Sequence, residues 1–264
     1  MLIFVATTLF AQSTGEVQRD NFYDRNINKE RQAQGYDYIN ERDVTQEKRI
    51  WRVISVDEKR NHHFKYDKAP FVNILLQAAK KGEITIYGTM DDEFKTPLTC
   101  AEAALLGTKT DTTIIYDFNT GRDTAIAVHN AFNPATVKKY RIKEVFYFDK
   151  ESGKMGVRIL GIAPIVQRYD ADGNFLNEGP LFWAYYPEAR EVLARHEVFN
   201  TENDATTMSW EDVFEARLFS SYVIKESNVF DRRIQDYAAG ERALIEGRNI
   251  QLDLQNKEAD NWEN

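Results

Sequence analysis

The sequence predicts an α+β fold in which mixed or antiparallel strands with short helices come first and a C-terminal helical layer follows. Two observations support this prediction. Between residues 48 and 186, short runs rich in β-branched and aromatic residues alternate with short helical patterns. After residue 186, apolar residues recur at every third or fourth position, which is the period of an amphipathic helix. Strands first and helices last are typical of the α+β class.

The first half of the strand-rich region is expected to hold three strands and two helices. The second helix has the clearest signal, because Thr99 and Glu102 have the spacing of a capping box and Gly107 follows as a C-cap. In chain order the expected elements are a strand at residues 50–56, a helix at 70–82, a strand at 83–87, a helix at 100–106 and a strand at 112–118.

The second half of this region is expected to form hairpins. Asn133 and Pro134 open a short helix, since proline is favoured at the first helical position. The remaining expected elements are a strand at residues 142–148, its hairpin partner at 155–169 with an interruption at Pro164, a turn at 170–174 and an extended segment at 175–186.

Residues 187–240 are expected to be helical throughout. Pro187 is placed as a first helical residue, and Ser209 with Asp212 has the spacing of an N-terminal capping box. The apolar positions assigned to the helical faces beyond this cap are Phe214, Leu218, Tyr222, Phe230, Ile234 and Tyr237.

The two ends of the chain differ from residues 48–240, which we expect to form a single domain. Residues 2–10 are apolar except for Thr7 and Thr8, and Phe-Ala precedes Gln12, like the end of a secretory signal. They lack a positively charged start, so residues 1–11 are either a truncated signal peptide, which is the interpretation we favour, or a buried strand. Residues 12–47 are expected to form an extended polar arm, and residues 241–264 a polar tail.

The arm has two interpretations. Its isolated Tyr, Phe and Ile side chains bury too little apolar surface to order the segment alone. It is either a frayed tail or a segment that becomes ordered against a neighbour, with Tyr and Phe as anchors. The sequence leaves both open.

Composition excludes several classes of partner. A chain of 264 residues with 42% hydrophobic residues can bury a sizeable core, and its net charge of −8 disfavours nucleic acid and anionic membranes. We therefore expect no nucleic-acid partner. No later segment is long and apolar enough to span a bilayer, so we also expect no direct membrane insertion. A single cysteine, Cys100, excludes an intramolecular disulfide and a multi-thiolate metal site.

The candidate metal ligands lack ligand spacing. Asp170, Asp172 and Asn174 alternate as in a calcium loop, but the glycine and the distal glutamate of such a loop are misplaced, so a hairpin turn is favoured. His62 and His63 are adjacent and point apart in regular structure, while His129 and His196 are solitary. We expect no metal and no cofactor.

Two clusters of acidic residues offer the pair that glycoside chemistry requires. One is Asp91, Asp92 and Glu93, and the other is Glu211, Asp212 and Glu215. Acid–base catalysis needs one desolvated and one ionised carboxyl group, whereas these clusters lie in turn and capping contexts. We therefore expect no catalytic residues.

The aromatic and arginine residues have the composition of interface hot spots. Burial in the core is the simpler expectation for each one alone, but as a set they are typical of protein–protein contacts. The candidate interface residues are Trp51, Trp183, Tyr186, Arg190, Trp210, Arg217 and Arg232.

Five stretches together resemble the GldN/PorN family of gliding motility and type IX protein secretion. They are KRIWRVISVDEKRN (48–61), GEITIYGTMDDEFKTPLT (82–99), RILGIAPI (158–165), FWAYYPEAREVLARHEVFN (182–200) and IKESNVFDRRIQDY (224–237). The resemblance extends from about residue 45 to the C-terminus.

The resemblance implies a non-catalytic structural subunit in the periplasm. Many copies would form a ring with a GldK/PorK-like outer-membrane lipoprotein, through which the ring is associated with the outer membrane. A GldM/PorM-like inner-membrane protein would reach the ring across the periplasm. Two alternatives remain open on the residues alone, namely an envelope hydrolase that uses the carboxylates and a peptidoglycan- or glycan-binding module that uses the aromatics.

Overall fold

The computed structural model describes residues 31–90, 92–117, 122–130, 132–170, 174–200 and 208–263. Its centre is an eight-stranded sheet with the order β12-β1-β6-β7-β9-β2-β3, in which β8 also pairs with β7. The strands of this sheet are β1 (Val44–Ser55), β2 (Ile86–Tyr87), β3 (Pro97–Leu98), β6 (Val137–Asp149), β7 (Lys154–Tyr169), β8 (Phe175–Pro180), β9 (Trp183–Tyr185) and β12 (Tyr222–Glu226).

Short helices and 3-10 turns lie before and between the strands, and a 3-10 turn and the long helix α5 follow the last one. They are η1 (Glu41–Asp43), η2 (Lys59–Lys65), α1 (Phe71–Lys81), α2 (Cys100–Leu105), η3 (Pro134–Thr136), α3 (Tyr186–Arg195), α4 (Trp210–Glu215), η4 (Ile234–Asp236) and α5 (Glu241–Glu263). The sheet pairings are antiparallel, which confirms the α+β class.

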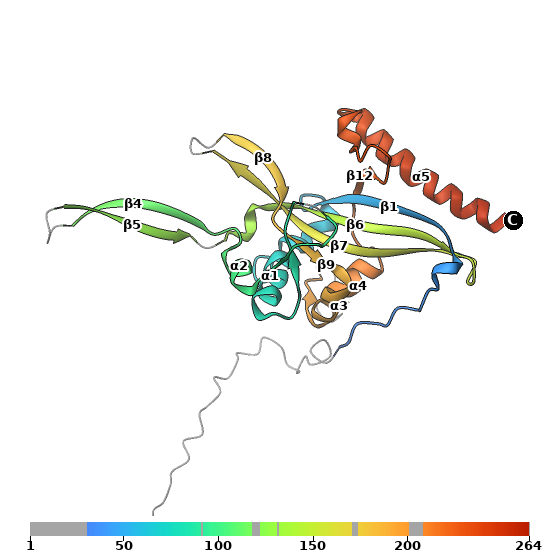
Figure 1. Ribbon diagram of the computed structural model, residues 1–264, viewed down its shortest axis with the longest axis horizontal. Helices are drawn as coiled ribbons and strands as arrows, with labels where there is room; N and C mark the ends of the chain where they lie inside the picture. The colour runs from blue at the N-terminus through green and yellow to red at the C-terminus, as the bar shows by residue number, and fades with distance from the viewer. Residues whose placement is uncertain are drawn as a thin grey trace, which may run out of the picture.

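The main core lies between the sheet and helices α1, α3 and α4, which Figure 1 shows on one side of the sheet. Trp210 is 1% exposed and lies among the rings of Phe64, Phe71 and Phe214, with centroids 4.4 to 6.3 Å away. Both predicted capping boxes are confirmed, at Thr99 for α2 and at Ser209 for α4.

A smaller second core lies under α5. Ile250 and Leu254 of this helix are buried against Val223 of β12 and Ile50 of β1. A Cβ on Gly247 would lie 2.7 Å from the Val223 carbonyl oxygen, so this position requires a glycine for close approach to β12. Residues 241–263, which the sequence indicated as a polar tail, thus form a docked helix whose apolar stripe is narrow.

The expectation that residues 187–240 are helical throughout is wrong. Helix α4 ends at Glu215, and residues 222–226 form the edge strand β12, in which burial alternates from one residue to the next. Strands β10 (Glu197–Val198) and β11 (Met208–Ser209) also lie in this region. Pairing of β12 with β1 outweighs the helical spacing of Phe214, Leu218 and Tyr222.

Two further boundaries differ from the sequence-based expectation. Strand β1 begins at Val44, inside the segment expected as an arm. Strand β7 continues through Pro164, because its outer neighbour changes there from β9, paired at Gly161 and Ile162, to β8, paired from Ile165. A missing N–H is tolerated at such a break in the ladder.

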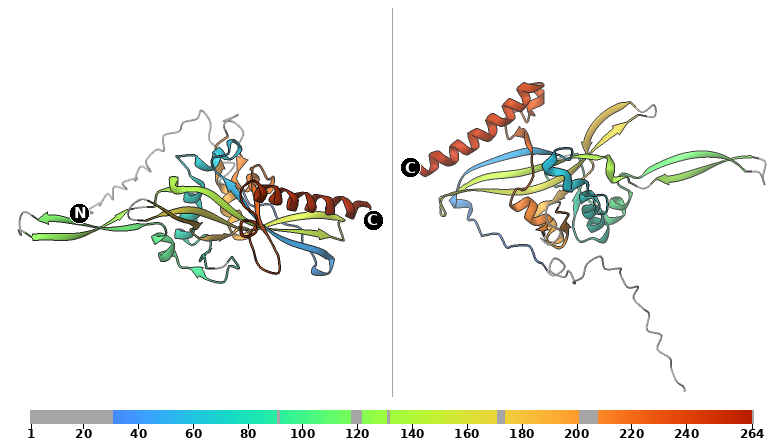
Figure 2. Two further views of the ribbon diagram at one scale, coloured as in Figure 1. Left: turned by 90° about the horizontal axis from the view of Figure 1, so that it is seen from above. Right: turned by 180° about the vertical axis from the view of Figure 1, so that it is seen from behind.

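A two-stranded hairpin projects from the body of the molecule. It consists of β4 (Lys109–Asp117) and β5 (Arg122–Asn130), which pair along their whole length. Figures 1 and 2 show it extending away from the sheet on the side opposite the C-terminal end of α5. Among the described residues, no helix is both long and apolar enough to cross a membrane.

Candidate functional site

An extended segment, residues 31–36, docks on a charged surface formed by α3, α4 and β7. We call this segment the docked arm. Its contacts are an Arg31–Asp212 ion pair of 2.5 Å, a 3.1 Å bond from the Gln34 amide to Glu211 Oε1, and a 2.6 Å bond from the Tyr36 hydroxyl to Glu215 Oε1. We define the arm-binding face as Arg158, Tyr186, Arg190, Glu211, Asp212 and Glu215.

The local sequence explains how two short helices build this face. Tyr186 and Arg190 are four residues apart on α3, so they lie on the same side of that helix. Glu211 and Glu215 have the same spacing from the first turn of α4 to its end, and the Ser209 cap fixes where α4 begins. The guanidinium and phenol groups of α3 therefore face the two carboxylates of α4.

Arg190 is the centre of the arm-binding face. It is 6% exposed and donates to Glu211 Oε1 at 2.6 Å, with Glu215 Oε1 3.5 Å away. It also donates to the main-chain carbonyl of Gln34 in the docked arm. A buried guanidinium needs acceptors on several sides, and the arm supplies one of them.

Tyr36 of the docked arm lies between two guanidinium groups. Arg158 and Arg190 lie 3.6 and 3.7 Å from its ring centroid, the geometry of paired cation–π contacts. Burial raises the pKa of the Tyr36 hydroxyl, and the Glu215 carboxylate that accepts its hydrogen bond raises it further. Burial and Glu215 likewise raise the pKa of Tyr186, whose hydroxyl donates to the same oxygen at 2.9 Å.

The three carboxylates of this cluster are all engaged as acceptors. Glu211 is paired with Arg190, Asp212 with Arg31 and the Ser209 cap, and Glu215 with two tyrosine hydroxyls. The arrangement is that of a surface that binds and orders a polar segment.

A second charged cluster involves Arg217, where the chain leaves α4. Glu144 of β6 is fully buried and accepts two bonds from Arg217, at 2.9 and 3.1 Å. Arg52 of β1 lies 3.6 Å from Glu144 and is held by Ser221 Oγ at 2.9 Å and Gln251 Oε1 at 3.1 Å. These contacts join β1 and β6 to α5 and to the segment between α4 and β12.

Five of the seven candidate interface residues are buried within the fold. Trp51 and Trp183 form a cluster with Ala163 on the sheet, and Trp210 lies in the main core. Tyr186 and Arg190 are buried in the arm-binding face. Buried tryptophans do not offer the exposed stacking platform that a glycan-binding module would need.

The other two candidates lie at the surface or partly so. The Arg217 side chain is half-buried. Its backbone has φ = 52° at the point where the chain leaves α4. Arg232 is exposed, with its guanidinium 4.4 Å from the centroid of the Phe230 ring. A role of the seven residues in binding a partner stays a prediction.

The first acidic cluster is divided. Asp92 accepts a 2.5 Å bond from Trp51 Nε1 and lies 3.3 Å from Lys143 Nζ, so it ties a loop to the sheet. Glu93 forms an ion pair with Lys95. Asp91 lies outside the described residues.

The candidate metal ligands do not converge among the residues that the structure describes. His63 packs against Phe64 and Trp210, and the His196 ring contacts the Val192 carbonyl. The Asn174 amide donates to Asp170 Oδ1 at 2.7 Å, while Asp172 and the His129 side chain lie outside what is described.

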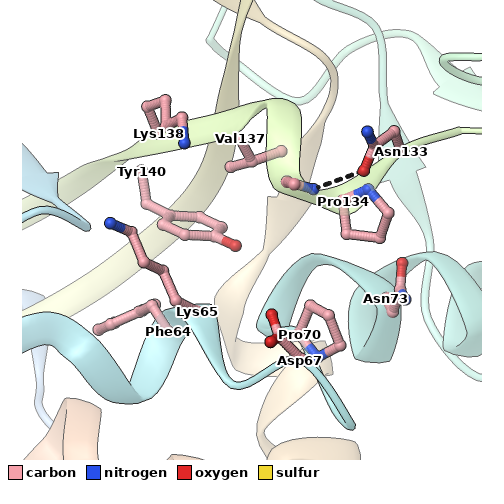
Figure 3. Close-up of a pocket in the computed structure, with 11 residues that line it drawn as sticks. Phe64, Lys65, Asp67, Pro70, Asn73, Asn133, Pro134, Val137, Lys138 and Tyr140 are labelled. Carbon is pink, nitrogen blue, oxygen red and sulfur yellow. Dashed lines mark hydrogen bonds between the residues drawn. The ribbon is translucent and has the colours of Figure 1, made fainter.

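A pocket of about 400 Å³ opens at the base of the β4–β5 hairpin (Figure 3). Pro70 and Asn73 line one wall, and Asn133 and Pro134 line another. The buried Tyr140 has a pKa raised by desolvation. The pocket lining contains one carboxylate, Asp67, so it lacks the carboxyl pair of a hydrolase.

Sequence reasoning missed Arg31, Gln34, Tyr36 and Arg158 as parts of the site. The first three lie more than 150 residues from their partners, so no local pattern connects them. The only signal was the presence of Tyr among polar residues in the arm.

Comparison with known families assigns the chain. A family model described as gliding motility associated protein GldN matches residues 39–263. The chain belongs to the GldN family. The match includes the sheet, α5 and the whole arm-binding face, and it places this GldN chain in the gliding motility and secretion machinery. Among curated proteins, no match is found.

Proposed function

We propose that this GldN chain is a non-catalytic structural subunit of the type IX secretion and gliding motility machinery. In this proposal it lies in the periplasm and forms a ring with a GldK/PorK-like outer-membrane lipoprotein. A GldM/PorM-like inner-membrane protein contacts the ring from below. The family match over residues 39–263 carries the proposal, because it spans nearly the whole described fold.

The geometry supports a binding role. The carboxylates that a hydrolase would use at α4 are engaged by Arg190, by Tyr186 and by the docked arm. The three tryptophans of the aromatic set, Trp51, Trp183 and Trp210, are buried in hydrophobic clusters. What the described surface offers instead is a rigid body with a projecting hairpin, a polar arm and a docked helix.

The test is purification of the tagged full chain from gently solubilised native envelopes, followed by sizing and mass spectrometry. The proposal predicts a very large particle with an outer-membrane lipoprotein in near-constant ratio to this chain. Recovery as a lone monomer under conditions that keep other envelope complexes intact would contradict it. Glu215→Gln and Glu93→Gln serve as the catalytic control, since a structural subunit needs neither carboxylate for any hydrolytic activity.

A further inference from the structure

The segment 31–43, which begins with the docked arm, is attached to the rest of the chain at two points with an exposed stretch between them. At one point, the Lys150 amide donates to the Asp43 carbonyl at 2.8 Å, and β1 begins at the next residue. At the other, residues 31–36 contact the arm-binding face. Between them Asp37, Tyr38 and Asn40 are exposed, and Tyr38 is 89% exposed.

The first attachment point lies at a tip of the molecule. Asp43 is in η1, which sits beside the turn between β6 and β7, and Figure 1 shows this turn at the far end of the two longest strands. The second view in Figure 2 shows the same end projecting from the body. A segment that leaves from a tip can turn back to its own domain or reach outward with little change in its anchor.

The contacts of the docked arm are of a kind that can be exchanged. They consist of an ion pair, hydrogen bonds to carboxylates and a tyrosine ring between two guanidinium groups. The basic Arg31 faces the acidic Asp212, and the arm carbonyl of Gln34 faces the cationic Arg190. None of residues 31–36 belongs to the hydrophobic clusters of the described residues, so release of the arm removes no member of a core.

We propose that in the assembled state residues 31–36 of one copy occupy the arm-binding face of the next copy, with residues 37–40 as the hinge. This inference rests on the proposed function for the existence of an assembly. Every contact described within one chain is reproduced between two identical chains, as in domain swapping. Four hinge residues span roughly 14 Å when extended.

Exchange of this kind gives a directional contact. The hinge leaves from the tip beside η1, whereas the arm-binding face lies on α3 and α4, so each copy donates one surface and accepts on another. Such head-to-tail contacts close into rings when the rotation allows. The docked arm faces an effective concentration of about millimolar within its own chain, so exchange requires neighbours held at comparable density.

The test is photo-crosslinking in the native host with two differently tagged full-length copies expressed together. A photoreactive amino acid replaces Gln34, whose exposed side chain is free to carry it while its backbone makes the contacts. The large particle is isolated, irradiated, denatured and captured through one tag. Exchange predicts a crosslinked dimer that carries both tags, with peptides from α4 joined to residue 34.

Matched variants distinguish crosslinks that depend on the docked arm from crosslinks between copies that merely lie close together. Arg158→Ala removes one wall of the Tyr36 site and is expected to lower the two-tag yield about tenfold, while Lys154→Ala on the same strand leaves it unchanged. Crosslinks confined within one chain in an intact large particle would overturn arm exchange and leave the proposed function standing. A lone monomer would overturn both.

Discussion

The two charged clusters of this molecule differ in what completes them. Around Glu144, every partner comes from the folded body, and the carboxylate is fully buried beneath Arg52 and Arg217. Around Arg190, the body supplies two carboxylates, and the remaining acceptor and the stacking ring come from residues 34 and 36 of the docked arm. The first cluster fastens the fold, whereas the second is a surface that is finished only when a polar segment binds it.

The largest expected effect on stability is at the cluster around Glu144. Glu144→Ala leaves Arg52 buried beside Arg217 without its carboxylate, which should lower the free energy of unfolding by about 3–5 kcal/mol. Urea unfolding measures it. Glu47→Ala, at an exposed pair with Arg49, is the control and should cost less than about 0.5 kcal/mol. A Glu144 effect as small as the control would remove the distinction between the clusters.

A smaller loss of stability is expected at the cluster around Arg190. Glu211→Ala removes the 2.6 Å partner of Arg190 but leaves Glu215 and the arm carbonyl, so about 2–3 kcal/mol should be lost. Thermal unfolding compares it with Glu191→Ala, an exposed change next to Arg190 on α3. Equal effects of the two substitutions would show that Arg190 does not depend on Glu211.

The core behind the arm-binding face should give a pH dependence. Burial lowers the pKa of His63 from 6.5 to about 4, and its ring lies 5.5 Å from that of Trp210. The unfolded chain therefore binds the proton first as pH falls, so about 2–3 kcal/mol of stability is lost between pH 6.5 and pH 4. Stability measured across this range should vary less in His63→Gln, whereas the exposed His62→Gln should behave like the original chain.

Docking of the arm on the cluster around Arg190 should weaken as the salt concentration rises. Tyr36→Ala removes a hydrogen bond and two cation–π contacts, so the arm is released while the free energy of unfolding changes by about 1 kcal/mol or less. Tryptic cleavage after Arg31 and Arg42 should accelerate several-fold in this variant, and in the original chain at about 0.5 M salt. Tyr38→Ala is the matched control, and acceleration there would contradict arm docking through Tyr36.

The smallest effect is expected outside both clusters. Arg232→Ala removes one exposed guanidinium next to the exposed Phe230 ring, so stability should change by less than about 0.5 kcal/mol. Urea unfolding of this variant sets the baseline for the other substitutions. A larger loss would mean that the loop before η4 contributes to the fold.

Local signals in the sequence predicted local structure. The spacing of Ser209 and Asp212 placed the start of α4 correctly, because a capping box is a contact between residues three positions apart. The same reasoning failed at Tyr222, where pairing with Val53 of β1 decides for a strand. Residues 241–263 look like a tail because only a narrow stripe, including Ile250 and Leu254, is buried.

The candidate site was predicted in part. Tyr186 and Arg190 were singled out by residue type, and the carboxylates of α4 by their clustering. Their combination with Tyr36 could not be predicted, because contacts between residues 36 and 215 leave no periodicity in the sequence. Trp51, Trp183 and Trp210 were chosen for composition that serves cores and interfaces equally well.

Hydrogen exchange of the Gln34 amide tests most directly the claim that the docked arm completes the Arg190 cluster. This amide donates to Glu211 Oε1 from a segment without regular structure, so its protection reports docking and nothing else. We predict exchange slowed at least about tenfold at low salt, with protection lost in Arg158→Ala and at about 0.5 M salt. Exchange of the Gln34 amide at the rate of an unprotected peptide at low salt would contradict the account.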